Sequence, residues 1–209
     1  MGGSAFSATL ASSAFPRLPR AVYLALKARL SPTIAELYAW VGVPREAPDK
    51  KDHGDLDLLV AIPKPPHNSS IPHEIIKRAI GATHVVPMDG NRTSNYAVPI
   101  QRGEWARFGH AKEEETSRSV NGDGEMYYQV RIYNRTVVLF LTFHSFQVDI
   151  HVCLDKAEWD RITFFHAYGD MGMILGLIAR NSGLTLGAKG LKVLHPVDIF
   201  ASPNIPHEI

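Results

Sequence analysis

The segment GDLDLLVAI, residues 54–62, constrains the fold of this chain more than any other part of its sequence. Successive side chains of a β-strand point to opposite faces, so Asp55 and Asp57 share one face. The other face is apolar and consists of Leu56, Leu58, Val60 and Ile62. This alternation predicts a strand whose leucines anchor it in a core. Burying a carboxylate is costly unless it is paired or binds a metal, so the two aspartates mark a candidate metal site.

A second strand-like run, residues 146–154, supplies another carboxylate. Asp149 lies on its polar side with Gln147 and His151, and the intervening residues are apolar. Three hard oxygen donors suit Mg²⁺ or Mn²⁺, and such ions can align a nucleoside triphosphate and stabilise a leaving pyrophosphate. The pattern therefore favours Asp55, Asp57 and Asp149 as one metal-binding set.

Other segments predict the elements around these strands. Helices are expected over residues 19–30, 73–80, 155–168 and 170–183, the second ending at Gly81. Hairpins are expected for residues 83–87 with 96–100 and for 184–194, and further strands for 126–132 and 136–143. The hydrophilic stretch 103–125 is interpreted as a solvated excursion without chemistry. The expected fold is α/β (α+β), a mixed β-sheet flanked by helices.

The order of these motifs is similar to that of the DNA polymerase beta-like nucleotidyltransferase superfamily. The resemblance covers residues 38–155 and depends on the G-D-L-D strand at Gly54 and the later V-D-I strand at Asp149. It implies a nucleotidyltransferase-like fold in which Asp55, Asp57 and Asp149 bind two Mg²⁺ or Mn²⁺ ions and act in catalysis. It also implies transfer of a nucleotidyl group from a nucleoside triphosphate to a hydroxyl.

The superfamily has a Gly-Ser pair upstream of the first aspartate, and here Gly42 is followed by Val43. Basic side chains or backbone amides could replace the missing hydroxyl in holding the triphosphate. The candidate nucleotide-binding residues are Gly42, Lys51, His53, Gly54 and Arg180. For His53 and Arg180 the alternatives are a solvated loop side chain and a surface charge at a helix end.

Two functions from different classes remain open at this point. The first is a metal-dependent nucleotidyltransferase whose acceptor is RNA, a protein or a small molecule. The second is a catalytically lapsed protein of the same fold that binds nucleotides or partners, which Val43 and the short C-terminal part favour. The net charge of +1 provides no extended basic field, which disfavours a long nucleic-acid track.

The length and composition of the chain indicate the number of domains and the cellular compartment of the protein. A chain of 209 residues that is 45% hydrophobic can bury one substantial core, so we expect a domain over residues 19–195 between a flexible tail, 1–18, and a C-terminal tail, 196–209. No apolar run reaches the ~20 residues needed to cross a bilayer. The single cysteine, Cys153, fits an intracellular protein, cytoplasmic or nuclear. The basic, acid-free first 35 residues are typical of a mitochondrial transit peptide or of a disordered start before a helix.

Overall fold

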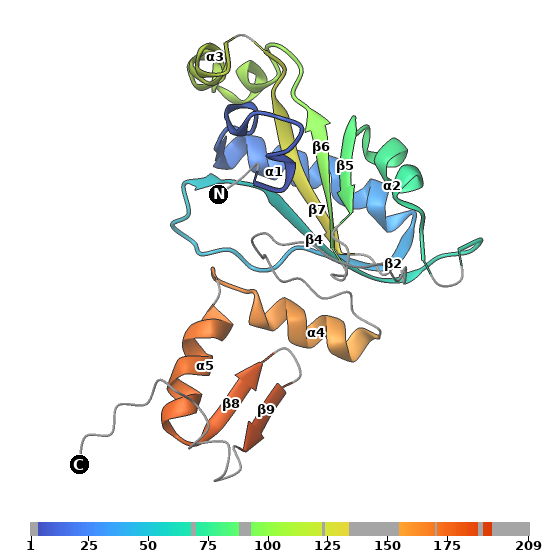
Figure 1. Ribbon diagram of the computed structural model, residues 1–209, viewed down its shortest axis with the longest axis vertical. Coiled ribbons are helices and arrows are strands. Elements are labelled where there is room, and N and C mark those ends of the chain that lie inside the picture. Colours follow the sequence, from blue (N-terminus) through green and yellow to red (C-terminus); the bar gives the residue numbers. More distant parts are fainter. Residues whose placement is uncertain are drawn as a thin grey trace.

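A five-stranded mixed sheet forms the centre of the protein (Figure 1). The structure is a computed structural model that describes residues 4–67, 70–87, 93–122, 124–133, 155–169, 171–187 and 190–193. In spatial order the strands are β2 (Tyr38–Gly42), β4 (Leu56–Pro63), β7 (Tyr127–Tyr133), β6 (Thr93–Pro99) and β5 (His84–Pro87). β4 and β7 are parallel, and the other neighbours are antiparallel. The predicted class, a mixed sheet with helices around it, is confirmed.

Helices α1 (Arg20–Ala35) and α2 (His73–Ile80) pack against one face of this sheet. The buried positions of α1 recur at roughly helical spacing, which gives the helix one apolar stripe. They are Val22, Tyr23, Leu26, Leu30 and Ile34. Opposite them, Leu56, Leu58 and Val60 of β4 are completely buried. The predicted strand and its core face are confirmed except at Ile62, which is 47% exposed and has a φ of 59°.

The N-terminal residues pack on the sheet, although their composition predicts a flexible tail. Residues 4–19 contain two 3-10 turns, η1 (Ser4–Phe6) and η2 (Ser12–Ala14), and strand β1 (Leu18–Pro19), which pairs with β3 (Asp52–His53). Phe6 and Phe15 are buried, with ring centroids 5.1 Å apart, and pack beside Tyr127 of β7. Two aromatic side chains therefore hold a segment whose small and polar residues gave no sign of order.

The hydrophilic stretch 103–125 is a helical cap and not the solvated excursion predicted. It forms η3 (Trp105–Phe108) and α3 (Ala111–Val120), which lies across the top of the sheet in Figure 1. Glu114 is buried and accepts hydrogen bonds from the backbone N–H groups of Gly103 (2.7 Å) and Trp105 (2.9 Å). It also pairs with Arg118 at 2.9 Å. The pattern was misleading because these charges are satisfied by each other and by backbone groups inside the fold.

Glu114 should make the stability of the fold depend on pH. Burial alone raises the pKa of this carboxyl, but the two backbone N–H groups and Arg118 together bring it below the ordinary value of 4.5. The folded chain therefore holds the ionised form more strongly than the unfolded chain does, and the resulting stabilisation is lost as pH falls through the folded pKa. Urea unfolding at pH 7 and pH 3.5 should show a larger loss for the wild type than for Glu114→Gln. Equal losses in the two proteins would contradict this assignment.

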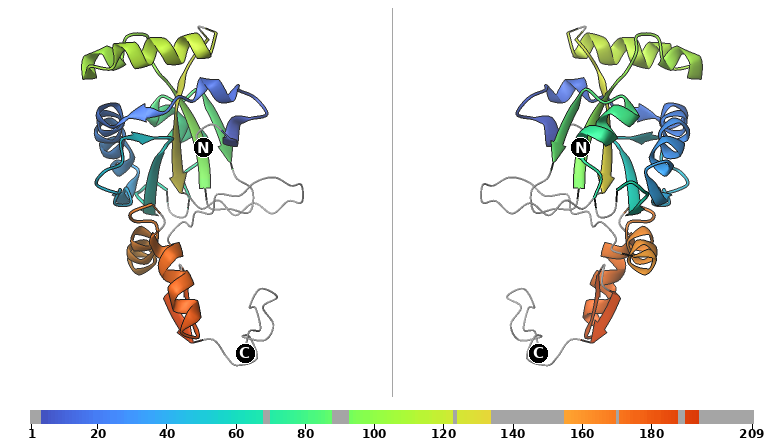
Figure 2. Two further views of the ribbon diagram at one scale, coloured as in Figure 1. Left: turned by 90° about the vertical axis from the view of Figure 1, so that its left-hand side faces the viewer. Right: turned by 90° about the vertical axis from the view of Figure 1, so that its right-hand side faces the viewer.

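The described residues from 155 onward form α4 (Lys156–Phe165), α5 (Met171–Asn181) and a hairpin of β8 (Leu184–Gly187) with β9 (Gly190–Val193). Asp155 caps α4, as predicted, by accepting a hydrogen bond from the backbone N–H of Glu158 at 2.7 Å. In Figures 1 and 2 α4 lies directly below the sheet, and α5 lies with the hairpin. The hairpin and the two helices were predicted, whereas the strands expected over 136–143 and 146–154 lie outside the described residues. None of the helices in the described ranges is long and apolar enough to cross a membrane.

Candidate functional site

The two aspartates lie where the chain enters β4. Asp55 directly precedes the strand, Asp57 is its second residue, and both side chains are partly buried. Asp57 alternates with Leu56 and Leu58, so its side chain is on the face of the sheet opposite α1. Asp55 lies outside the strand, so the alternation of β4 fixes the face of Asp57 alone, and a common face for the two aspartates stays a prediction.

Another carboxylate, that of Glu46, belongs to the loop 43–51 and interacts with Tyr23 of α1. Burial raises the pKa of the Tyr23 hydroxyl, and a hydrogen bond to Glu46 raises it further. The negative charges of Glu46, Asp57 and Asp55 add to the same effect. Glu46 is therefore the carboxylate that contacts Tyr23, and the two aspartates act on it more weakly through their charge. Sequence reasoning did not find Glu46 because the loop 44–52 has no periodic pattern.

His53 is part of this cluster and is buried, so the solvated-loop alternative for it is wrong. Only 1% of its surface is exposed, and its ring stacks on Tyr23 with centroids 3.7 Å apart and planes at 9°. Its Nδ1 lies 3.8 Å from Oε1 of Glu46. Burial is the main cause that lowers the pKa of His53. The neutral imidazole thus supports Tyr23 and the loop from within the core.

The face that carries Asp57 is polar in the centre of the sheet. Asp57 is aligned with Arg131 of β7, and Arg131 is aligned with Asn95 of β6. Asn95 and Gln129 are buried, and the Gln129 amide donates a hydrogen bond to the Asn95 side-chain oxygen at 3.3 Å. Buried amides hold their positions through such bonds. Asn95 and Gln129 therefore make the centre of this face polar, next to the strand that carries Asp57.

The need for glycine at residue 42 is explained by a contact with the indole ring of Trp159 in α4. It is aligned with Leu59 of β4, and a Cβ atom built on it would lie 2.5 Å from Cζ2 of Trp159. The Trp159 indole N–H donates a hydrogen bond to the Leu59 carbonyl at 3.3 Å. The absence of a side chain at residue 42 therefore lets the indole lie against β2 and β4 at Gly42 and Leu59. Val43, which follows, packs against the main core.

Gly42→Ala should disturb this contact and lower stability by about 1–3 kcal/mol, the usual cost of overpacking. Urea unfolding followed by circular dichroism would measure the loss. The same alanine in a Trp159→Leu background should cost much less, because the indole that it meets is gone. An equal cost in both backgrounds would contradict the steric assignment.

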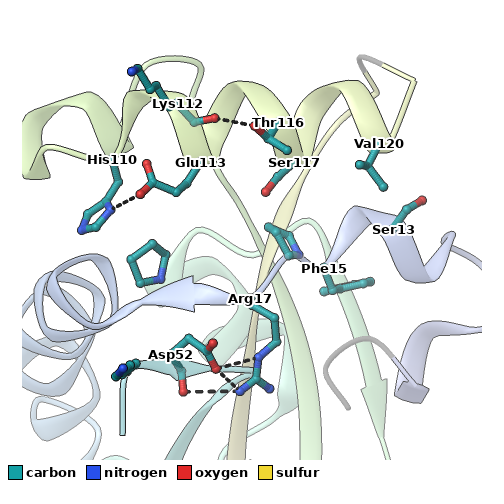
Figure 3. A pocket seen from close by; sticks show the side chains of 13 residues that line it. Ser13, Phe15, Arg17, Asp52, His110, Lys112, Glu113, Thr116, Ser117 and Val120 are labelled. Carbon is teal, nitrogen blue, oxygen red and sulfur yellow. Dashed lines mark hydrogen bonds and ion pairs between the residues drawn. The ribbon is translucent and has the colours of Figure 1, made fainter. Parts of the chain in front are cut away.

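The remaining predicted nucleotide-binding residues lie in different places. Gly54 directly precedes Asp55, whereas Lys51 lines an open groove of about 700 Å³ between α3 and the N-terminal segment (Figure 3). In that groove Arg17 pairs with Asp52, and His110 pairs with Glu113. Arg180 is exposed in the last turn of α5, away from the start of β4. The structure thus brings Gly54 and His53 to the carboxylates and leaves Lys51 and Arg180 apart.

Asp149 lies outside the described residues. Within the ranges that the structure describes, no three His, Cys, Asp or Glu side chains are arranged so that they could hold a metal ion. No protein-family model matches this chain, and no protein with a curated description matches its sequence.

Proposed function

We propose that this chain is a metal-dependent nucleotidyltransferase in which Asp55, Asp57 and Asp149 bind Mg²⁺ or Mn²⁺. The observation that carries the proposal is the position of Asp57 in β4, on the polar face of a mixed sheet, with Asp55 directly before the strand. Carboxylates held by a strand are more rigidly placed than carboxylates in a free loop, as a metal site requires. The substrate is a nucleoside triphosphate, and the acceptor carries a hydroxyl.

The residues fit a hard divalent cation. Their donors are carboxylate oxygens, the ligands that Mg²⁺ prefers. Asp55 and Asp57 do not form a complete metal-holding group with the other described acidic or histidine side chains, so the site depends on Asp149 for its third ligand. Bound there, two ions would stabilise charge on the triphosphate and favour ionisation of the acceptor hydroxyl. The chain itself would orient the ions through Asp55, Asp57 and Asp149.

The sequence around Asp149 supports its inclusion. The motif Gln147-Val148-Asp149-Ile150 has the same pattern as Gln129-Val130-Arg131-Ile132 of β7, with an aspartate where β7 has Arg131. Asp149 thus lies on the polar side of a run whose alternation is like that of β4 around Asp57. We therefore assign the third metal ligand to Asp149.

The direct test is transfer from a labelled nucleoside triphosphate. The purified chain is incubated with Mg²⁺ or Mn²⁺ and candidate RNA, protein and small-molecule acceptors, and released pyrophosphate is measured. We expect release that requires the metal and that Asp149→Asn abolishes. Release that is unchanged in Asp149→Asn would reject the assignment of this residue.

A second candidate function is nucleotide binding without turnover. It is favoured by Val43 in the position of the family's serine and by Trp159, which covers Gly42 at the expected phosphate-binding position. Calorimetric titration separates the two candidates. Metal-dependent binding of the triphosphate without pyrophosphate release would favour the binding protein, whereas release with any acceptor would reject it.

A further inference from the structure

Two tryptophans form a partly open aromatic surface beside the candidate site. Trp40 of β2 is 40% exposed, and Trp159 of α4 is partly buried. Their ring centroids are 6.2 Å apart and their planes are inclined at 43°. The third tryptophan, Trp105, is fully buried and donates its indole N–H to the Tyr128 hydroxyl at 3.0 Å. The contrast shows that the fold buries one indole completely and leaves Trp40 accessible.

A lysine lies over both of these rings. Nζ of Lys156 is 4.8 Å from the centroid of Trp40 and 5.3 Å from that of Trp159. It also forms an ion pair with Asp160, one turn later on α4. The lysine side chain is 41% exposed and flexible, so its ammonium can move to a neighbouring anion. The surface thus combines two π-faces with a mobile positive charge.

This surface is on the same face of the sheet as Asp57. Trp40 is aligned with Ala61 of β4, and Gly42 is aligned with Leu59. Ala61 and Leu59 are separated from Asp57 by even numbers of residues, so all three side chains are on the same face of β4. Asp57 and Ala61 are four residues apart along the strand, a separation of about 13 Å at the usual rise per residue. An extended nucleotide can span this separation, with its phosphates at one end and its base at the other.

We propose that Trp40 and Trp159 bind the base of the nucleotide and that Lys156 contacts its phosphates. The base stacks on the Trp40 indole in the place that the ammonium takes in the free protein, and the ammonium turns to the phosphate chain. Stacking of bases on aromatic side chains tolerates every base, because each has a π-face. The inference rests on the proposed function for the position of the phosphates, but the stacking itself needs no metal.

Tryptophan fluorescence tests the stacking directly. Adenosine monophosphate is titrated into the full-length protein without metal, and quenching of the emission is measured. We expect saturable quenching in the wild type and an apparent Kd at least about tenfold higher in Trp40→Leu. Phe108→Leu replaces an aromatic side chain that is 38% exposed on η3, away from the surface, and should behave like the wild type. Circular dichroism checks that each variant is folded.

The outcomes separate this inference from the proposed function. Equal Kd values for the wild type and Trp40→Leu, or no quenching of the wild type, would overturn the stacking site. Asp57→Asn should keep the quenching by adenosine monophosphate and lose metal-dependent binding of adenosine triphosphate. Quenching that depends on Trp40, together with triphosphate binding that ignores both metal and Asp57, would refute the proposed function and leave the aromatic site supported.

Discussion

Asp57→Asn is expected to lower metal-dependent nucleotidyl transfer about a hundredfold or more. The substitution keeps the size of the side chain and removes the negative charge that would hold the cation. Because Asp57 is only partly buried, the asparagine can be accommodated at the start of β4 without displacing the core. The measurement is the rate of pyrophosphate release at saturating Mg²⁺, with urea unfolding to confirm that stability is preserved.

Asp49→Asn is the matched control for this substitution. Asp49 is exposed in the loop that precedes β3, so the same chemical change there should leave the rate within about twofold of the wild type. Raising the Mg²⁺ concentration should partly restore Asp57→Asn if the defect lies in metal binding. A stable, correctly folded Asp57→Asn protein with a wild-type rate would remove Asp57 from the site.

Glu114→Ala is expected to destabilise the fold by about 3–5 kcal/mol. The substitution leaves Arg118 as a buried charge without its carboxylate, and the backbone N–H groups of Gly103 and Trp105 lose their acceptor. The guanidinium keeps its bond to the carbonyl of Ile100 at 3.1 Å. Urea unfolding at pH 7 measures the loss of stability.

The adjacent residue provides the control for Glu114. Glu113 carries the same carboxylate on the same helix, but its side chain is 53% exposed and pairs only with His110 among the described residues. Glu113→Ala should therefore lower the stability far less than Glu114→Ala, because exposed ion pairs contribute little. A similar cost for the two variants would show that the buried pair does not stabilise the 103–118 segment.

Local signals in the sequence predicted much of the secondary structure. The alternation in β4, the Gly81 stop after α2, the Asp155 cap of α4 and the final hairpin each depend on neighbouring residues. Such features can be read from short segments because propensity, capping and turn chemistry act over a few residues. The aspartates of the candidate site were found in the same way, through their place in the alternation of β4.

What the sequence did not predict depends on contacts between distant segments. The burial of His53 requires Tyr23 from α1, and Gly42 is explained only by Trp159, which lies far along the chain. Glu114 was assigned to solvent because its partners are largely backbone groups, which leave no pattern in the side chains. Tertiary contacts override local preference at these positions, and no property of the separate segments anticipates them.

The parallel pairing of β4 with β7 has a consequence for how the protein folds as it is synthesised. β2 is complete before β4 emerges, so this antiparallel pair can form early, but β7 follows only after α2, β5, β6 and α3. Closing so long a loop is slow, and domains fold as their segments leave the ribosome. Until then the second edge of β4 presents unpaired backbone groups on an apolar strand. Nascent chains stalled between β4 and β7 should therefore be the form of this protein most dependent on chaperones.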